Sequence, residues 1–186
     1  DTYVSVTRGG YLKRTSPRSY SASTLEELGK REDDELIFLA QAKTTQHLLL
    51  FTNLGNVIYR PVHELADIRW KEIGEHLSQT ITTYGVEEEI IHAELVDDFE
   101  TSAVYMAVTA HGQIKRFERS DIAPWRTYKS KALKYAKLKD DKDRVVLLTF
   151  ANDEDVMLVS QKGYALRFNS SEVPIVSNKA AGVKAM

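Results

Sequence analysis

Cysteine is absent from this chain of 186 residues, and proline and tryptophan are scarce, with four and two residues. Without cysteine the protein can form no disulfide, no thiolate nucleophile and no zinc finger or iron–sulfur site, so we expect a reducing, cytoplasmic location. No apolar run reaches the roughly 18 to 20 residues needed to span a bilayer, and residues 1–10 lack the plan of a signal peptide. Membrane insertion and secretion are therefore not expected.

The chain also lacks an excess of charge of one sign, since 25 Lys and Arg stand against 27 Asp and Glu, a net charge of −2. This balance argues against a uniformly basic nucleic-acid binder. The charges are nevertheless segregated, because residues 112–139 hold nine basic and two acidic side chains, a local balance of +7 that leaves −9 for the remainder. A protein that neutralises phosphates while staying soluble needs such segregation.

Candidate catalytic groups are few. The histidines have no neighbour at metal-ligand spacing; they are His47, His63, His76, His92 and His111. The acidic pairs 97–98 and 140–141 are typical of hairpin turns, although paired carboxylates for acid–base work stay an alternative. No phosphate-binding glycine loop and no G-x-S-x-G motif occurs. The sequence therefore predicts neither a catalytic residue nor a metal site.

A repeated pattern organises the chain around Gly10, Gly55, Gly112 and Gly163. Apolar residues stand six and four positions before each glycine, Thr or Ser stands three before it, and an apolar residue stands two after it. Apolar residues at a spacing of two on both sides of a turn are typical of a hairpin with one buried face, and glycine permits the positive φ of a tight turn. The sequence therefore predicts four strand–turn–strand units.

The glycines lie 45, 57 and 51 residues apart, in the range of propeller-like blades. Further strands are predicted at 36–40, 90–96 and 145–150, each running through a short turn into the next repeat, so that each blade would have three or four antiparallel strands. We expect an all-β fold, a propeller-like array that forms one module over residues 1–186. About four blades would be an incomplete set, because the last residues look like the start of another unit.

Basic residues recur shortly after each glycine, on what would be one rim of the array. At the third to fifth place after the glycine stand Lys13, Arg14, Arg60, Lys115, Arg116 and Arg167. Such cations either hold phosphates or merely keep exposed strands soluble, and the residues alone leave both readings open. The aromatic residues Trp125, Tyr128 and Tyr135 interleave with the basic stretch and are expected to pack rather than to stack on bases.

The segment 6–15, VTRGGYLKRT, resembles the C-terminal domain of the A subunit of bacterial type IIA DNA topoisomerases, and the four repeats extend the resemblance over the chain. The resemblance implies a β-pinwheel, a propeller-like fold with up to six blades, and double-stranded DNA as the partner. Residues 21–30 lack the glutamine-arginine-glycine-lysine box of gyrase A, so the chain looks more like the A subunit of topoisomerase IV. No Arg-Tyr pair of the kind that carries the catalytic tyrosine occurs.

The resemblance implies further that this piece holds no cofactor and cuts no DNA, whereas the whole enzyme would use Mg²⁺ and ATP at sites outside the chain. Its other partners would be the core of the A subunit, as a homodimer, and the B subunit. The predicted DNA contacts are the rim cations and their neighbours, namely Arg8, Lys13, Arg14, Arg60, Lys115, Arg116, Arg119, Arg126, Lys129, Lys131 and Arg167. A gyrase A domain without the box, and a propeller-type protein-interaction scaffold, are the alternatives.

Overall fold

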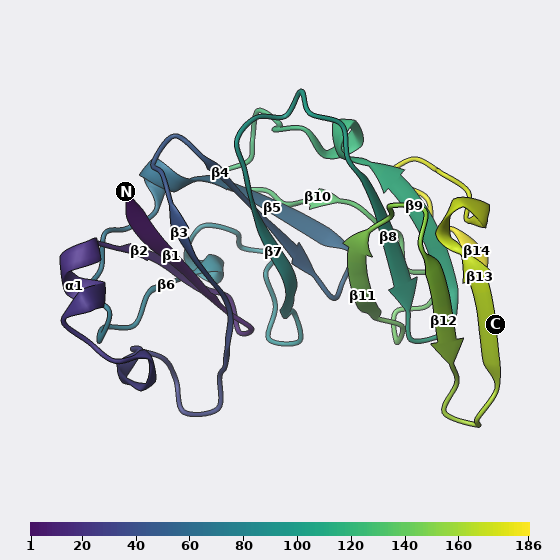
Figure 1. Cartoon of the computed structure of the whole chain (residues 1–186), viewed down its shortest axis with the longest axis horizontal. Helices are drawn as coiled ribbons and strands as arrows, with labels where there is room; N and C mark the ends of the chain where they lie inside the picture. The colour runs from purple at the N-terminus through teal and green to yellow at the C-terminus, as the bar shows by residue number, and fades with distance from the viewer. The chain divides into compact units, whose positions relative to one another are not determined.

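The computed structural model describes residues 1–186, and its regular secondary structure is mainly β-strand (Figure 1). The strands are β1 (Thr2–Thr7), β2 (Tyr11–Thr15), β3 (Leu36–Ala42), β4 (His47–Thr52), β5 (Asn56–Pro61), β6 (Glu75–His76), β7 (Ile90–Val96), β8 (Val104–Thr109), β9 (Gln113–Glu118), β10 (Leu133–Lys134), β11 (Val145–Phe150), β12 (Asp155–Val159), β13 (Ala165–Asn169) and β14 (Val183–Lys184). The short helices are α1 (Pro17–Ser21) and the 3₁₀ turns η1 (Leu25–Glu27), η2 (Val62–Glu64), η3 (Leu77–Gln79), η4 (Arg119–Ile122) and η5 (Ser170–Glu172). No helix has the length and apolar character that crossing a membrane requires.

The strands form four separate sheets, one for each repeat. Blade 1 has the strand order β3-β1-β2-β6, blade 2 has β10-β5-β4-β7, blade 3 has β11-β8-β9-β14, and blade 4 has β12-β13. The hairpin that the glycine pattern predicted lies at the centre of the first three sheets and forms the whole of the fourth, and its two strands pair antiparallel. The prediction of an all-β array of about four antiparallel blades is confirmed.

The predicted grouping of strands within a blade was wrong in one respect. The strand that precedes each repeat pairs backwards with the previous hairpin: β3 with β1, β7 with β4, and β11 with β8. The physical reason is that both edges of β4 are already occupied, by β5 and β7, so β3 finds no free edge on the strand that follows it. The short turn after each such strand therefore leads from one sheet into the next.

The chain divides into two compact units. Unit 1 comprises residues 1–52, 57–98 and 124–133, and unit 2 comprises residues 53–56, 99–123 and 134–186. The core of unit 1 is aliphatic and includes Val4, Val6, Leu48, Leu50 and Ile58, all fully buried. The core of unit 2 includes Met106, Val108, Ile114 and Val173. The single module over residues 1–186 stays a prediction.

The hairpin turns show why glycine and a hydroxyl residue recur. Gly10 and Gly112 have φ values of 97° and 87°, a conformation that disfavours any side chain. In the same turns the Thr7 Oγ1 and Thr109 Oγ1 atoms each accept a hydrogen bond of 3.1 Å from the backbone N–H four residues on. The hydroxyl therefore satisfies a backbone donor at the tip, and the predicted tight turns are confirmed.

Candidate nucleic-acid interface

Lys13, a predicted DNA contact on β2, is buried and points into the protein. Its Nζ atom donates hydrogen bonds to the backbone oxygens of Arg69, Trp70 and Glu72, at 3.1, 2.7 and 2.5 Å. Burial lowers the pKa of the Lys13 ammonium to about 8, which keeps it protonated at neutral pH. Lys13 therefore clasps, through these hydrogen bonds, a segment that follows the hairpin of blade 2 in the chain and returns to blade 1.

Lys115 repeats this arrangement in blade 3. Its Nζ atom lies within hydrogen-bond distance of the backbone oxygens of Ser177, Asn178 and Ala180, at 2.8, 3.4 and 2.9 Å, and of Tyr135, at 2.7 Å. The three protons of the ammonium group are shared among these four acceptors. The first three acceptors have the same relative spacing as the three that Lys13 binds. Burial again lowers the pKa of Lys115 to about 8.

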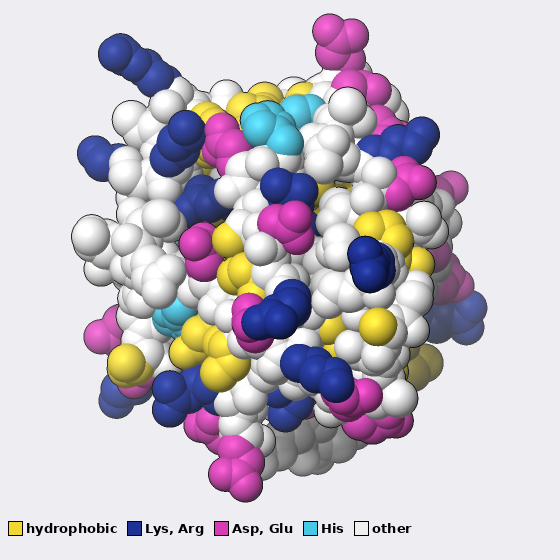
Figure 2. All heavy atoms as spheres, turned by 90° about the vertical axis from the view of Figure 1, so that its left-hand side faces the viewer, with side chains coloured by type: hydrophobic (Ala, Val, Ile, Leu, Met, Phe, Trp, Pro, Cys, Tyr) yellow, Lys and Arg dark blue, Asp and Glu magenta, His cyan; other side chains and the backbone are white.

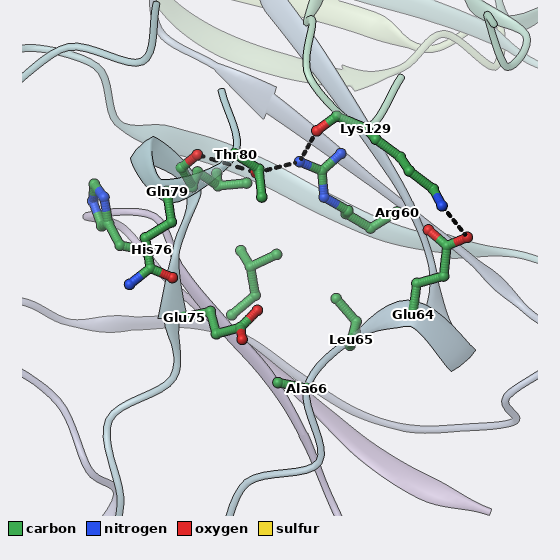
Figure 3. A pocket seen from close by; sticks show the side chains of 11 residues that line it. Arg60, Glu64, Leu65, Ala66, Glu75, His76, Gln79, Thr80 and Lys129 are labelled. Carbon is green, nitrogen blue, oxygen red and sulfur yellow. Dashed lines mark hydrogen bonds and ion pairs between the residues drawn. The ribbon is translucent and has the colours of Figure 1, made fainter. Parts of the chain in front are cut away.

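Blade 2 has the apolar Ile58 at the corresponding position, and Arg60 clasps the returning segment instead. The Arg60 guanidinium donates to the backbone oxygens of Tyr128 and Lys129, at 2.9 and 3.1 Å, and to the Thr80 Oγ1 atom at 2.8 Å. Figure 3 shows the guanidinium between Thr80 and the main chain of Lys129, beside a cavity of about 380 Å³. Burial lowers the pKa of Arg60. A buried cation therefore holds the returning segment in each of the three blades.

Each returning segment forms a four-residue turn where it is held. The turns span residues 69–72, 127–130 and 177–180, and in each the last backbone N–H donates to the first backbone oxygen, at 3.0 to 3.1 Å. We call these the clasped turns. Their third residues are lysines whose side chains are exposed: Lys71, Lys129 and Lys179. The clasp thus fixes the main chain and leaves an ammonium group in solvent.

The structure corrects the placement of four predicted contacts. The prediction put them on an exposed rim, but Lys13, Arg60, Lys115 and Arg119 are only 2, 8, 1 and 8% exposed. The clasping cations already donate hydrogen bonds to backbone oxygens, and the Arg119 Nε atom donates to the Tyr105 hydroxyl at 3.0 Å. Phosphates of a duplex cannot reach donors that are buried and already bonded, so the rim placement of these four residues was wrong.

Arg14 and Arg116, the neighbours of the clasping lysines, are half-buried. The Arg14 Nε atom donates to the backbone oxygen of Leu65 at 2.8 Å, and the Arg116 Nε atom donates to that of Val173 at 2.7 Å. Both oxygens lie at the ends of 3₁₀ turns, η2 and η5, that follow the next blade's hairpin. These arginines therefore also fasten a blade to a distant segment of the chain, and present only part of the guanidinium to solvent.

Three predicted contacts are exposed and form ion pairs. Arg8 pairs with Glu35, Arg167 with Asp155 at 2.6 Å, and Lys129 with Glu64 at 3.5 Å. The remaining two predicted contacts, Arg126 and Lys131, are exposed and have no acidic partner. Three further cations follow them along the chain and are exposed: Lys134, Lys137 and Lys139. The exposed positive charge is thus concentrated between residues 126 and 139.

The part of this basic stretch that lies in unit 1 is an ordered loop. The Trp125 Nε1 atom donates to the backbone oxygen of Lys131 at 2.8 Å and closes the loop. The Tyr128 ring lies 4.8 Å from the Tyr59 ring, and its hydroxyl donates to Glu64 at 2.9 Å. In unit 2, Tyr135 is fully buried. The aromatic residues therefore pack, as the sequence predicted.

Sequence reasoning missed Lys71 and Lys179. A signal exists, because each of these lysines is followed three residues later by a glycine, Gly74 or Gly182. A Cβ atom at either glycine would collide with the backbone of the adjacent strand, β2 or β9. The alignment on hairpin glycines hid this second repeat, because the segments between the hairpins differ in length.

The face of the molecule on the side of α1 is mixed in charge. Figure 2, which looks onto the side of Figure 1 on which α1 lies, shows Lys and Arg side chains interspersed with Asp and Glu. Throughout the chain, no group of three or more His, Asp or Glu side chains is placed to hold a metal ion. The fold and the clasped turns define a bladed β domain that carries exposed lysines on its turns.

This bladed β domain matches a known protein family. The family described as "DNA gyrase C-terminal domain, beta-propeller" matches residues 1–24, 46–97, 104–151 and 154–186. These ranges cover most of the chain, which therefore belongs to the DNA gyrase C-terminal domain family.

Among curated relatives the chain is similar to the A subunit of DNA topoisomerase 4. It is 68% identical to the protein of Streptococcus pneumoniae over 186 residues, all of this chain and 23% of the relative. It is 39% identical to the protein of Bacillus subtilis, over 99% of this chain and 22% of the relative. The chain thus spans less than a quarter of these relatives, and the predicted likeness to the A subunit of topoisomerase IV is confirmed.

Solved structures agree with the sequence relatives. A crystal structure of the C-terminal domain of DNA topoisomerase IV matches with a TM-score of 0.88 and 42% identity, over 98% of this chain and 56% of that chain. The DNA gyrase A C-terminal domain matches with a TM-score of 0.61 and 28% identity, over 100% of this chain and 60% of that chain. The fold is therefore that of the family.

Proposed function

We propose that this domain binds duplex DNA by its phosphate backbone through exposed cations of the clasped turns and the basic loop. The observation that carries the proposal is the recurrence of an exposed lysine, Lys71, Lys129 or Lys179, at the third place of every clasped turn. A buried cation fixes the main chain below each of these lysines, so the lysine loses less conformational freedom when it meets a phosphate.

The proposed binding is independent of base sequence. Lysine and arginine side chains that neutralise phosphates gain affinity chiefly from the release of condensed counterions. Base readout by a recognition helix in the major groove needs a longer helix than α1, which has five residues and is the longest in the chain. Arg126 and Lys131, which have no acidic partner, add to the phosphate-binding set.

The relatives, which are named as A subunits of DNA topoisomerase 4, support a wider proposal. Within a type IIA topoisomerase, the domain would hold a bent DNA segment and position it for strand passage, in decatenation or relaxation, by the catalytic core. Its protein partners would be the core of the A subunit, as a homodimer, and the B subunit, in the cytoplasm of a bacterium. Mg²⁺ and ATP would act at sites outside this chain.

Fluorescence anisotropy with a linear duplex of about 40 base pairs, titrated with salt, tests the DNA-binding proposal. If six or more phosphates are neutralised, affinity should fall on the order of a thousandfold between roughly 50 and 200 mM salt, whatever the base sequence. Lys131→Gln should lower the slope of log affinity against log salt by about 0.9. Weak binding that does not depend on salt would contradict the proposal and favour a protein-interaction scaffold.

A further inference from the structure

A hollow lies beside α1 in blade 1, and none of the sequence-predicted contacts lines it. Its volume is about 610 Å³, and it is lined by Ser16, Arg18, Ser19, Ala22, Ser23, Arg69, Lys71 and Glu72. Three of these side chains are cationic, three carry hydroxyl groups and one is acidic. They come from two segments far apart in the sequence, the stretch around α1 and the clasped turn 69–72.

Several hydrogen-bond donors at the hollow have no acceptor. The Ser16 Oγ atom accepts from the Ser19 backbone N–H at 3.2 Å, and the Ser19 Oγ atom accepts from the Trp70 backbone N–H at 3.1 Å. Because each oxygen acts here as an acceptor, each hydroxyl keeps its own proton for another partner. The Arg18 guanidinium is exposed and forms neither a hydrogen bond nor an ion pair. An anion with several acceptor oxygens would satisfy these hydroxyl and guanidinium donors.

The other two cations are held in place by the clasp. The buried Lys13 ammonium binds the backbone oxygens of Arg69, Trp70 and Glu72, and so fixes the turn from which the Arg69 and Lys71 side chains project. Arg69 pairs with Glu72, and Lys71 pairs with Glu27, each at 2.6 Å. Exposed ion pairs of this kind contribute about 1 kcal/mol or less, so a phosphate can replace the carboxylates.

We propose that this hollow binds a phosphate of the duplex DNA backbone, with Arg18, Arg69 and Lys71 supplying the charge and the Ser16 and Ser19 hydroxyls supplying neutral donors. The inference rests on the proposed function and names a site for it on blade 1. A phosphodiester suits the hollow because its two unesterified oxygens can each accept several hydrogen bonds.

Blade 3 offers an internal comparison. Its clasped turn 177–180 has Lys179 at the position of Lys71, but Ser177 stands at the position of Arg69. Ser120 follows the blade 3 Lys-Arg pair at the same distance as Arg18 follows that of blade 1. The hollow of blade 1 therefore combines three cations where blade 3 retains one.

The first experiment measures duplex affinity against salt for Arg18→Gln and Lys71→Gln. Each variant should lower the slope by about 0.9 and weaken binding about tenfold at low salt. Lys43→Gln is the charge-matched control, because Lys43 is exposed in the turn between β3 and β4 and has no side-chain partner. Equal losses in Lys43→Gln and Arg18→Gln would overturn the site, since they would reflect total charge alone.

The second experiment follows backbone amide NMR signals while the duplex is added. The Ser19 and Trp70 amides should shift, because they donate to the two hydroxyls that would bind the phosphate. Inorganic phosphate at the same concentration should shift them far less; equal or larger shifts would indicate a free-anion site and overturn the DNA assignment. The comparison with inorganic phosphate thus distinguishes a site for a DNA phosphate from a site for a free phosphate ion.

The same spectra separate this inference from the proposed function. Shifts in the loop 125–131 without shifts at Ser19 and Trp70 would leave DNA binding in place and overturn the hollow. Shifts at Ser19 and Trp70 alone would support the hollow and contradict the role of the loop. No shift in either region at low salt would overturn both.

Discussion

Blades 1 and 3 share one internal framework but present different surfaces. In both, a buried lysine on the second hairpin strand binds three backbone oxygens of a returning turn, and the next residue, an arginine, binds the oxygen at the end of a 3₁₀ turn. The turn itself reads RWKE in blade 1 and SNKA in blade 3. The comparison shows that the pair Lys-Arg belongs to the framework, whereas the exposed charge is set by the turn it holds.

Blade 2 shows which part of the framework is required. Its hairpin has Ile58 in place of the clasping lysine. Arg60, two residues further along the strand, binds the equivalent turn 127–130 instead. The feature shared by all three blades is therefore a buried cation that satisfies backbone oxygens, and not a lysine at one position. Buried carbonyl groups without donors would cost stability in any of the blades.

The largest expected effect comes from removing a clasp. Lys13→Met and Lys115→Met should each lower the free energy of unfolding by about 3 kcal/mol, because several buried backbone oxygens lose a charged donor. Ile58→Met in blade 2 is the matched control and should cost less than about 1.5 kcal/mol. Urea unfolding measures all three. Equal stability of Lys13→Met and the parent protein would contradict the clasp.

The hairpins could be predicted from the sequence because their signals are local. Apolar alternation, a hydroxyl residue and a glycine all lie within a few residues of each turn, and Gly10 has the positive φ that this pattern implies. The pairing of β3 with β1 could not be predicted, because adjacency in sequence favoured β4. Only the occupied edges of β4 exclude that choice.

The candidate site was harder to predict for a different reason. Lys13 and Arg14 look like surface cations in the sequence, and the partners that bury Lys13 lie 56 to 59 residues away. No local pattern reveals such partners. Arg126, Lys129 and Lys131 could be proposed from the sequence, because the basic stretch 112–139 is visible directly, whereas Arg18 and Lys71 come together only through the fold.

A second test of the blade comparison uses pH. Burial lowers the pKa of Lys13 and Lys115 from 10.5 to about 8, so above pH 8 the native protein binds fewer protons than the unfolded chain. The free energy of unfolding should therefore rise with pH, by at most about 1.4 kcal/mol per unit for each lysine. Burial raises the pKa of Tyr84, which opposes this trend only above its ordinary value of 10.0.

Urea midpoints between roughly pH 7.5 and 9.5 measure this rise before tyrosines titrate in the unfolded chain. Lys13→Met and Lys115→Met should each remove about half of it, because the two blades carry equivalent clasps. A rise that survives in the double variant would assign it to other groups and contradict the comparison.

A substitution of Arg60 tests whether a clasp affects DNA binding only by positioning the clasped turn. Arg60→Met should release the main chain of Tyr128 and Lys129 and weaken duplex binding roughly threefold, with the salt slope unchanged, because Arg60 itself meets no phosphate. Lys129→Gln should lower the slope by about 0.9 instead. Anisotropy titrations at several salt concentrations separate the two. A reduced slope in Arg60→Met would show that Arg60 contacts phosphate after all.

The smallest expected effect concerns the ion pair between Glu64 and Lys129, the exposed lysine of the clasped turn 127–130. Glu64 lies 3.5 Å from the Lys129 ammonium (Figure 3). Glu64 also accepts a hydrogen bond from the Tyr128 hydroxyl. Glu64→Gln should raise duplex affinity about twofold, because a phosphate no longer displaces a carboxylate, and should change stability by less than about 1 kcal/mol. Glu26→Gln, an exposed acid without a partner, is the charge-matched control, measured by the same anisotropy titration. If both variants raise affinity equally, net charge accounts for the gain, and Glu64 does not compete with DNA for Lys129.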